Sequence, residues 1–232
     1  EFFFKKIINS IVKKNYSKNI VFSGGCALNS SANKFITDKG KKFEKVFINY
    51  APGDNGGALG AAFVVASKYN QKLSNIRSPY LGREFNKNQI EEILKKVQYS
   101  KKLTFDYLHS EEELFETASK YIIDGKVIGW FQGKMEFGPR ALGNRSILAD
   151  PRNPNMKDII NKKIKRRESF RPFAPSVLEE FQSEWFESEF FNPYMSSLAT
   201  VREEKRKMIP AVTHFDNTAR LQTVNKKLNQ KF

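Results

Sequence analysis

The most constraining feature of the chain is a repeated order of short apolar segment, glycine-rich turn and helix near its N-terminus. "NIVFSGG" (19–25) predicts a short buried strand that runs into glycines, and "KVFINY" (45–50) predicts a second strand. Helical patterns cover residues 1–14, 27–38 and 56–69. Because alternating strands and helices pack as parallel strands under covering helices, we predict an α/β fold.

A polar stretch with Gly and Pro but no clear period, residues 70–88, predicts an interdomain linker. Beyond it, a helix begins at a capping box, with Ser110 at the N-cap, Glu113 three residues later and Gly125 near the end. Other helices are predicted over 88–97 and 153–164, and strands over 103–108, 127–131, 170–178 and 192–201.

Both ends of the chain break off inside a pattern. No Met begins the sequence, and residues 218–232 predict a strand that runs into an uncompleted helix. We therefore expect a piece of a longer protein.

Two glycine turns follow the N-terminal strands. Gly24 and Gly25 lie between a strand and a helix, where the backbone can approach a ligand and a helix N-terminus favours an anion. The alternative is a tight structural turn, which the spacing alone favours because it matches no phosphate-loop signature. Asp54, in the second turn, can ligate a cation or cap the following helix.

The stretch "GWFQGKMEFGPRALGNRSILADPR" (129–152) concentrates glycines and arginines in one turn. Arg140 and Arg145 flank Gly143, and guanidinium groups bind phosphate through two parallel hydrogen bonds. The alternative is a structural turn whose arginines pair with Glu136 or Asp150.

A second basic stretch, "KIKRRESFRPFAP" (163–175), would deliver Lys165, Arg167 and Arg171 to one anionic pocket. The alternative is a cationic helix C-terminus that complements the helix dipole. Two Arg-rich turns so far apart in the chain favour convergence on a shared anion.

Composition limits the class of protein. The formal charge is +15, from 40 Lys plus Arg against 25 Asp plus Glu, which favours anionic partners. Nucleic acid is the less favoured of these, because most of the surplus is scattered lysine. Cys26 is the single cysteine, so no disulfide framework exists, and no apolar run is long enough to span a bilayer. We expect a cytoplasmic protein without a membrane partner.

Taken in order, five stretches resemble the NodU-type O-carbamoyltransferases of nodulation and antibiotic tailoring. They are "GGCALN", "PGDNGGALGAA", the 129–152 stretch, "KIKRRESFRPFAPSV" and "HFDNTARLQTV". The resemblance implies that residues 1–78 are the C-terminal part of an actin-like (ribonuclease H-like) domain. Residues 79–232 would be most of a YrdC-like α/β domain with a twisted mixed sheet.

The resemblance also implies the chemistry. The YrdC-like domain would make carbamoyl adenylate from carbamoyl phosphate and ATP. The actin-like domain would pass the carbamoyl group to a hydroxyl of a sugar or other natural product, with a divalent metal, iron or magnesium, bound. Its histidine metal ligands and base would lie upstream of residue 1, so whether the fragment alone is active stays open. The oligomeric state stays open, a homodimer included.

The family's functional positions map onto this chain as follows. Gly24, Gly25 and Asn29 match the nucleotide-contacting turn, and Asp54 matches a metal-site carboxylate. Lys165, Arg167 and Arg171 match the catalytic phosphate-holding set; Arg140, Arg145 and Ser146 would complete the pocket. Two alternatives stay open, a threonylcarbamoyl-adenylate synthase and a basic RNA-binding module. The 135–148 stretch favours the carbamoyltransferase over the former.

Overall fold

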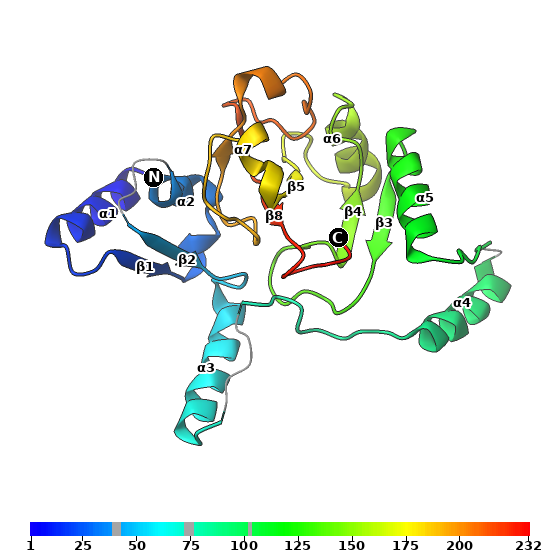
Figure 1. Ribbon diagram of the computed structural model, residues 1–232, viewed down its shortest axis with the longest axis horizontal. Helices are drawn as coiled ribbons and strands as arrows, with labels where there is room; N and C mark the ends of the chain where they lie inside the picture. The colour runs from blue at the N-terminus through cyan, green and yellow to red at the C-terminus, as the bar shows by residue number, and fades with distance from the viewer. Residues whose placement is uncertain (39–42, 72–76, 102–103) are drawn as a thin grey trace.

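A computed structural model describes residues 1–38, 43–71, 77–101 and 104–232 (Figure 1). Its N-terminal part holds α1 (Phe2–Lys14), β1 (Asn19–Phe22), α2 (Ser30–Thr37), β2 (Lys45–Ile48) and α3 (Asp54–Lys68), with a short 3₁₀ helix, η1 (Gly25–Leu28), after β1. β1 and β2 pair in parallel, and Ile8, Ile36 and Phe43 form the small core beside them. The strand–helix order and the parallel pairing predicted from the sequence are confirmed.

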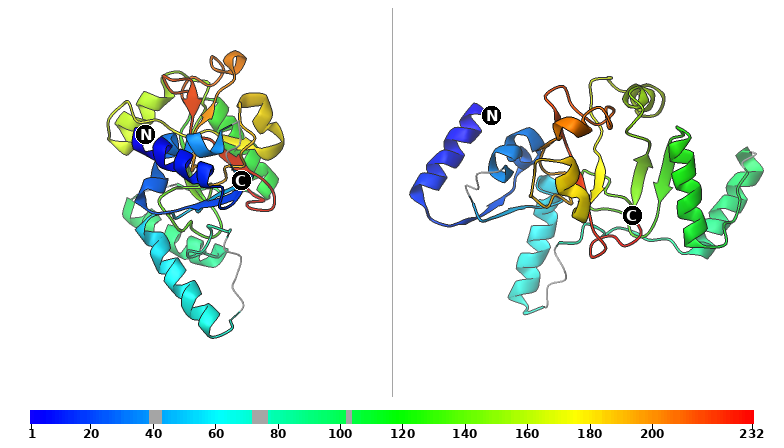
Figure 2. Two further views of the ribbon diagram at one scale, coloured as in Figure 1. Left: turned by 90° about the vertical axis from the view of Figure 1, so that its left-hand side faces the viewer. Right: turned by 45° about the horizontal axis from the view of Figure 1, so that its top comes forward.

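Helix α3 projects from the body of the molecule in every view (Figures 1 and 2). None of its residues is buried, and Val64 and Val65 are more than half exposed. Of its glycines, Gly56 is required by packing, because an added Cβ would lie 1.9 Å from the Ala51 carbonyl oxygen. Gly57 and Gly60 have open space around them among the described residues.

Within the range 70–88 predicted as a linker, residues 72–76 lie outside the described residues, and the linker stays a prediction. α4 (Lys87–Lys101) and α5 (Glu111–Ile123) follow. The N-cap at Ser110 is confirmed, because the Glu113 amide donates to Ser110 Oγ at 3.1 Å, and Gly125 has a φ of 76°. The return bond differs from a capping box, since Glu113 Oε2 accepts from the His109 amide at 2.7 Å. The strand predicted over 103–108 is wrong for the described residues 104–108, which form no regular structure; residue 103 lies outside the described residues. Its apolar and aromatic residues find no strand to pair with in the part of the chain that the structure describes.

The C-terminal strands pair two by two. β3 (Ile128–Phe131) runs antiparallel to β4 (Arg145–Leu148), and β6 (Ala199–Thr200) runs antiparallel to β7 (Thr218–Ala219). β5 (Ser176–Leu178) runs parallel to β8 (Gln222–Val224). The described residues therefore form small separate sheets rather than the single mixed sheet that we expected.

The remaining elements are short. α6 (Met156–Ile159) continues as a π-helix, η2 (Ile160–Lys165), in place of the helix predicted over 153–164. The strand predicted over 170–178 shrinks to β5 because Pro172 and Pro175 have no N–H to donate to a ladder. Likewise only Ala199–Thr200 of the range 192–201 is a strand, and residues 225–232 form turns instead of the predicted helix. Also present are η3 (Glu179–Phe181), α7 (Gln182–Trp185) and η4 (Glu203–Lys205).

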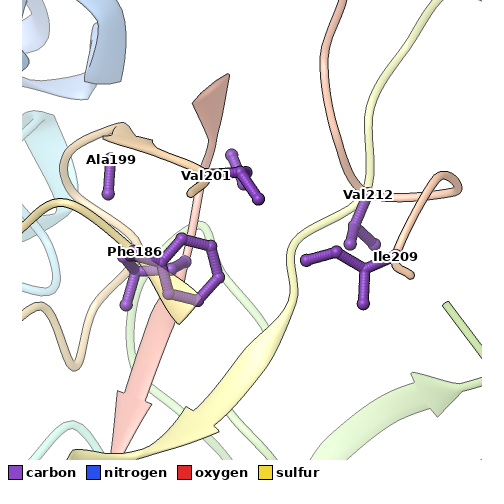
Figure 3. Close-up of a cluster of buried hydrophobic side chains, with 7 residues drawn as sticks. Phe186, Ala199, Val201, Ile209 and Val212 are labelled. Atoms are coloured by element: carbon purple, nitrogen blue, oxygen red, sulfur yellow. The ribbon is translucent and has the colours of Figure 1, made fainter. Parts of the chain in front are cut away.

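The largest apolar core lies between α7, β6 and the segment that leads to β7. Figure 3 shows part of it, with Ile209 and Val212 side by side and Phe186 near Val201. A second core joins the two parts of the chain: Tyr50 and Ala51, after β2, pack with Leu142 and Tyr194. The domain boundary at residues 78 and 79 stays a prediction.

The molecule exposes a large surface. Its accessible area is 15637 Å², against roughly 10,800 Å² for a compact monomer of this mass. Among the described helices, none combines the length and apolar character needed to cross a membrane.

Candidate functional site

The two N-terminal glycine turns meet at the carboxyl ends of β1 and β2. The Gly24 amide donates to the Pro52 carbonyl at 2.6 Å, which joins the turns directly. Gly24 has a φ of 96°, so its backbone conformation favours glycine, whereas Gly25 has an ordinary one. An added Cβ on either residue would meet no described atom within 4 Å, so this edge is open to a ligand.

Asn29 and Asp54 border the same turns. Asn29 is the N-cap of α2, and its Oδ1 accepts a hydrogen bond from the Ala32 amide at 3.1 Å. Asp54 is exposed in the first turn of α3, whose N-cap is Gly53. Within the described ranges, no three His, Cys, Asp or Glu side chains gather as a metal site would require, so Asp54 can supply one ligand at most.

A cavity of about 520 Å³ lies in the C-terminal part. It is walled on its apolar side by residues such as Ile147, Met156 and Phe173. Four of the predicted site residues line it: Arg140, Ser146, Lys165 and Arg167. Two cationic residues that we did not predict, Lys157 and Arg220, line it as well. The structure therefore brings the two Arg-rich stretches together around one concave space.

Burial and mutual repulsion destabilise the charged forms of the arginines in this cavity. Burial and, to a lesser extent, the charges of Arg140 and Arg167 together lower the pKa of Arg220 to about 10. Burial also lowers the pKa of Arg140, and burial followed by the Arg171 charge lowers that of Arg167. Each of these shifts would be relieved by an anion placed between the guanidinium groups.

Protein carboxylates in the described residues do not neutralise the cavity. Asp150 lines it, but both of its oxygens accept hydrogen bonds from Arg152, at 2.7 to 2.9 Å. These bonds hold the pKa of Asp150 below its usual value. Arg220 Nε is buried and has no hydrogen-bond partner among the described residues. Among the described residues, the site is thus a cationic pocket whose guanidinium groups have the chemistry to bind an anion.

The glycine-rich turn of the 129–152 stretch has a different role from the one we expected. Glu136 is buried, and its Oε1 accepts from the amides of Leu142 at 2.6 Å and Asn144 at 2.9 Å. These N–H groups therefore face a carboxylate of the protein and not an incoming phosphate. Gly138 and Gly143, with φ of 126° and 109°, allow the backbone to turn around that carboxylate.

Arg145 lies outside the cavity lining. Its guanidinium donates to four backbone carbonyls, those of Gln132, Asn144, Arg83 and Gly133, and stacks at 3.6 Å from the ring centroid of Phe131. These contacts make it a brace for the turn. Neither Glu136 nor Asp150 is its side-chain partner.

Arg171 and Ser146 differ in position. Arg171 is exposed, lies outside the lining, and has its Nε 3.4 Å from Glu168 Oε2. Ser146 lines the cavity while its Oγ accepts from the Gly143 amide at 3.0 Å. Arg171 therefore reaches the cavity only through its charge on Arg167.

Sequence reasoning missed Arg220 and Lys157. Arg220 follows β7 at the turn into β8, inside the quoted "HFDNTARLQTV" stretch. The motif contributed to the family resemblance and so drew attention to this segment. Nothing local in it indicates that the Arg220 side chain lies beside Arg140 and Arg167. Lys157 carries no signal beyond its place at the start of α6.

Comparisons with known proteins cover most of the chain. A family model described as Carbamoyltransferase N-terminus matches residues 2–63, and one described as Carbamoyltransferase C-terminus matches residues 119–232. Nodulation protein NolO of Bradyrhizobium diazoefficiens is 42% identical over 218 residues, 92% of this chain and 39% of that protein.

Two further relatives carry informative names. Nodulation protein NolNO of Sinorhizobium fredii is 41% identical over 93% of this chain and 32% of its own length. The 3'-hydroxymethylcephem-O-carbamoyltransferase of Amycolatopsis lactamdurans is 36% identical over 88% of this chain and 36% of its own length. The chain thus spans well under half of each of these relatives.

Proposed function

The chain belongs to the carbamoyltransferase family, and on that premise we propose that it is part of an ATP-dependent O-carbamoyltransferase. In this proposal the donor is carbamoyl phosphate, the activated intermediate is carbamoyl adenylate, and the acceptor is a hydroxyl of a sugar or another natural product. The name of the cephem relative supports the acceptor class, because it describes carbamoyl transfer to a hydroxymethyl group.

The observation that carries the proposal is the clustering of Arg140, Arg167 and Arg220 around one cavity without a free carboxylate among the described residues. In the proposed reaction, carbamoyl phosphate first loses its phosphate to water. A carbamate oxygen then forms a bond to the α-phosphorus of ATP, and the bond to pyrophosphate breaks. Carbamoyl phosphate, ATP and pyrophosphate are polyanions and carbamate is an anion, so a cationic pocket lowers the barrier mainly by neutralising charge and aligning the reactants.

The cationic side chains divide this work by position. Lys165 is exposed at the end of η2 and can follow a departing phosphate, since an ammonium is a mobile point charge. Arg140 and Arg167 are partly buried and belong to two different Arg-rich stretches. Their guanidinium groups can hold phosphate oxygens in a fixed geometry. Apolar walls at Ile147 and Met156 leave room for a less polar portion of the substrate.

Carbamoyl transfer to the hydroxyl would take place at the N-terminal turns. Gly24, Gly25 and Asn29 leave an open edge for a nucleotide, and Asp54 stands beside it. A divalent metal, iron or magnesium, would need ligands besides Asp54, so we derive no step through it. The proposed architecture is an actin-like part up to residue 78 and a YrdC-like part beyond it, in a cytoplasmic enzyme.

The test is ATP–pyrophosphate exchange that depends on carbamoyl phosphate, measured on the full-length protein. We expect exchange in the wild type and its loss in Lys165→Ala and Arg167→Ala. Lys162→Ala is the matched control, because Lys162 is an exposed lysine of the same π-helix outside the cavity lining. Folded wild type without exchange would refute carbamoyl adenylate formation. Exchange that requires threonine and bicarbonate instead would favour a threonylcarbamoyl-adenylate synthase.

A further inference from the structure

Asn161 lies in η2, directly behind the basic loop of the cavity, and is fully buried, with 0% of its surface exposed. Its side chain makes three hydrogen bonds. Nδ2 donates to the Ser169 carbonyl at 3.3 Å and to the Arg171 carbonyl at 2.9 Å, and Oδ1 accepts from Arg167 Nε at 2.7 Å. Its carbonyl also accepts from the Arg167 amide at 3.1 Å.

These bonds close the loop from 166 to 171 onto the helix. The loop begins at Arg166, which has a φ of 48° where η2 ends, and it carries several cations that repel one another. Like charges favour an open loop, so a neutral group must draw its two ends together. The Asn161 side-chain amide holds the two ends together through these hydrogen bonds. Because its Nδ2 and its Oδ1 both have partners, burying this polar group carries little free-energy penalty.

The same bonds set the direction of the Arg167 guanidinium. Asn161 occupies Nε, and the ring of Phe173 lies beneath the guanidinium at 4.9 Å from its centroid. Among the described residues, the two terminal nitrogens of Arg167 have no hydrogen-bond partner. They are the pair of parallel donors that binds a phosphate oxygen pair, and Arg167 and Phe173 both line the cavity.

We infer that Asn161 is a positioning residue for anion binding: it holds Arg167 with its terminal nitrogens toward the cavity and keeps the basic loop closed. The inference rests on the proposed role of the cavity as the ATP site. Asn161 does not line the cavity, so it acts on a bound anion only through Arg167 and the loop.

The test is a double-mutant cycle on ATP affinity, measured by calorimetry on the full-length protein. Asn161→Ala should weaken ATP binding roughly tenfold, the size of one lost charge-assisted hydrogen bond. In an Arg167→Ala background the same change should cost less than about twofold, because its main partner is gone. An equal loss in both backgrounds would overturn the inference.

Asn192→Ala is the matched control. Asn192 is also buried, with 2% of its surface exposed; its Nδ2 donates to the Ser197 carbonyl at 2.8 Å and its Oδ1 accepts from the Ser196 amide at 2.8 Å. Among the described residues, none of its side-chain hydrogen bonds goes to a cation of the cavity. We expect Asn192→Ala to lower the Tm and leave ATP affinity unchanged; a loss of ATP affinity equal to that of Asn161→Ala would reduce the Asn161 effect to general destabilisation.

A second variant covers the case in which Asn161→Ala does not fold. Asn161→Asp keeps an oxygen for Arg167 Nε and places a negative charge against the guanidinium, so it should also weaken ATP binding. Wild-type affinity in Asn161→Asp would contradict the inference. The proposed function can fail while the inference holds. This is the result if the double-mutant cycle shows coupling of Asn161 to Arg167 in ATP binding but the wild type shows no ATP–pyrophosphate exchange. Wild type that binds neither ATP nor pyrophosphate would overturn both.

Discussion

Gly138 lies so close to Tyr50 that a methyl group added to its α-carbon would stand 2.6 Å from the Tyr50 carbonyl oxygen. Tyr50 follows β2 in the N-terminal part, and Gly138 begins the turn that presents Arg140 to the cavity. The turn thus has two faces, one against the N-terminal part and one toward the cationic pocket. A substitution that disturbs the packing against Tyr50 should therefore also change the position of Arg140 at the cavity.

Gly138→Ala should destabilise the protein by about 2–4 kcal/mol. It adds a clash with backbone and places Ala at a φ of 126°. Urea unfolding measures the change. Gly57→Ala is the control, because Gly57 lies within α3 with open space around it, and it should stabilise by roughly 0.5–1 kcal/mol. Equal changes in unfolding free energy for the two variants would show that the close approach of Gly138 to Tyr50 does not contribute to stability.

Glu136→Ala should destabilise by about 3 kcal/mol, since the amides of Leu142 and Asn144 lose a buried acceptor. Glu136→Gln keeps an oxygen at that place and should lose less than half as much. Urea unfolding, together with ATP affinity, separates the two variants. Gln as damaging as Ala would mean that the carboxylate charge matters more than the accepted hydrogen bonds.

Arg140→Ala should mainly reduce ATP affinity, whereas Arg145→Ala should mainly reduce stability. Arg140 lines the cavity and has no hydrogen-bond partner among the described residues, so its loss should weaken ATP binding roughly tenfold with little change in stability. Arg145 braces four carbonyls, so its loss should lower stability by about 2 kcal/mol. Calorimetry and urea unfolding of both variants check this, and a reversed pattern would contradict our assignment.

The lowered pKa of Arg220, about 10, predicts proton uptake on anion binding. A bound anion favours the charged guanidinium and raises its pKa, so at pH 10 ATP binding should take up a fraction of a proton. Titrations in buffers of different ionisation enthalpy measure the uptake. Arg220→Met retains the other cations, including Lys157 and Lys165, so the difference from wild type isolates Arg220. No difference would show that Arg220 does not face the anion.

The same pKa has a stability consequence of known sign. Because the folded pKa of Arg220 lies below that of the unfolded chain, the unfolded state binds more protons above about pH 10. The contribution of Arg220 to stability therefore rises as pH increases through that range. At neutral pH it is constant.

The local features of this protein could be predicted from its sequence. The parallel pairing of β1 with β2 follows from strand–turn–helix order, and the start of α5 follows from Ser110 and Glu113, because these signals act over a few residues. The long 129–152 and 163–177 motifs also carried the family resemblance. Prediction failed where a strand depends on a partner from elsewhere in the chain: residues 104–108 have a strand-like pattern but no strand to pair with among the described residues.

Which cations share the cavity depends on contacts between distant segments of the chain and could not be predicted from the sequence. Arg140 and Arg145 are five positions apart in one motif, yet one lines the cavity and the other binds backbone carbonyls. Arg220 joins Arg140 and Arg167 because β8 pairs with β5, and the paired residues are 46 positions apart in the chain. The pattern of a sequence specifies which side chains can bind an anion. The direction in which each one points depends on long-range packing, which no short motif encodes.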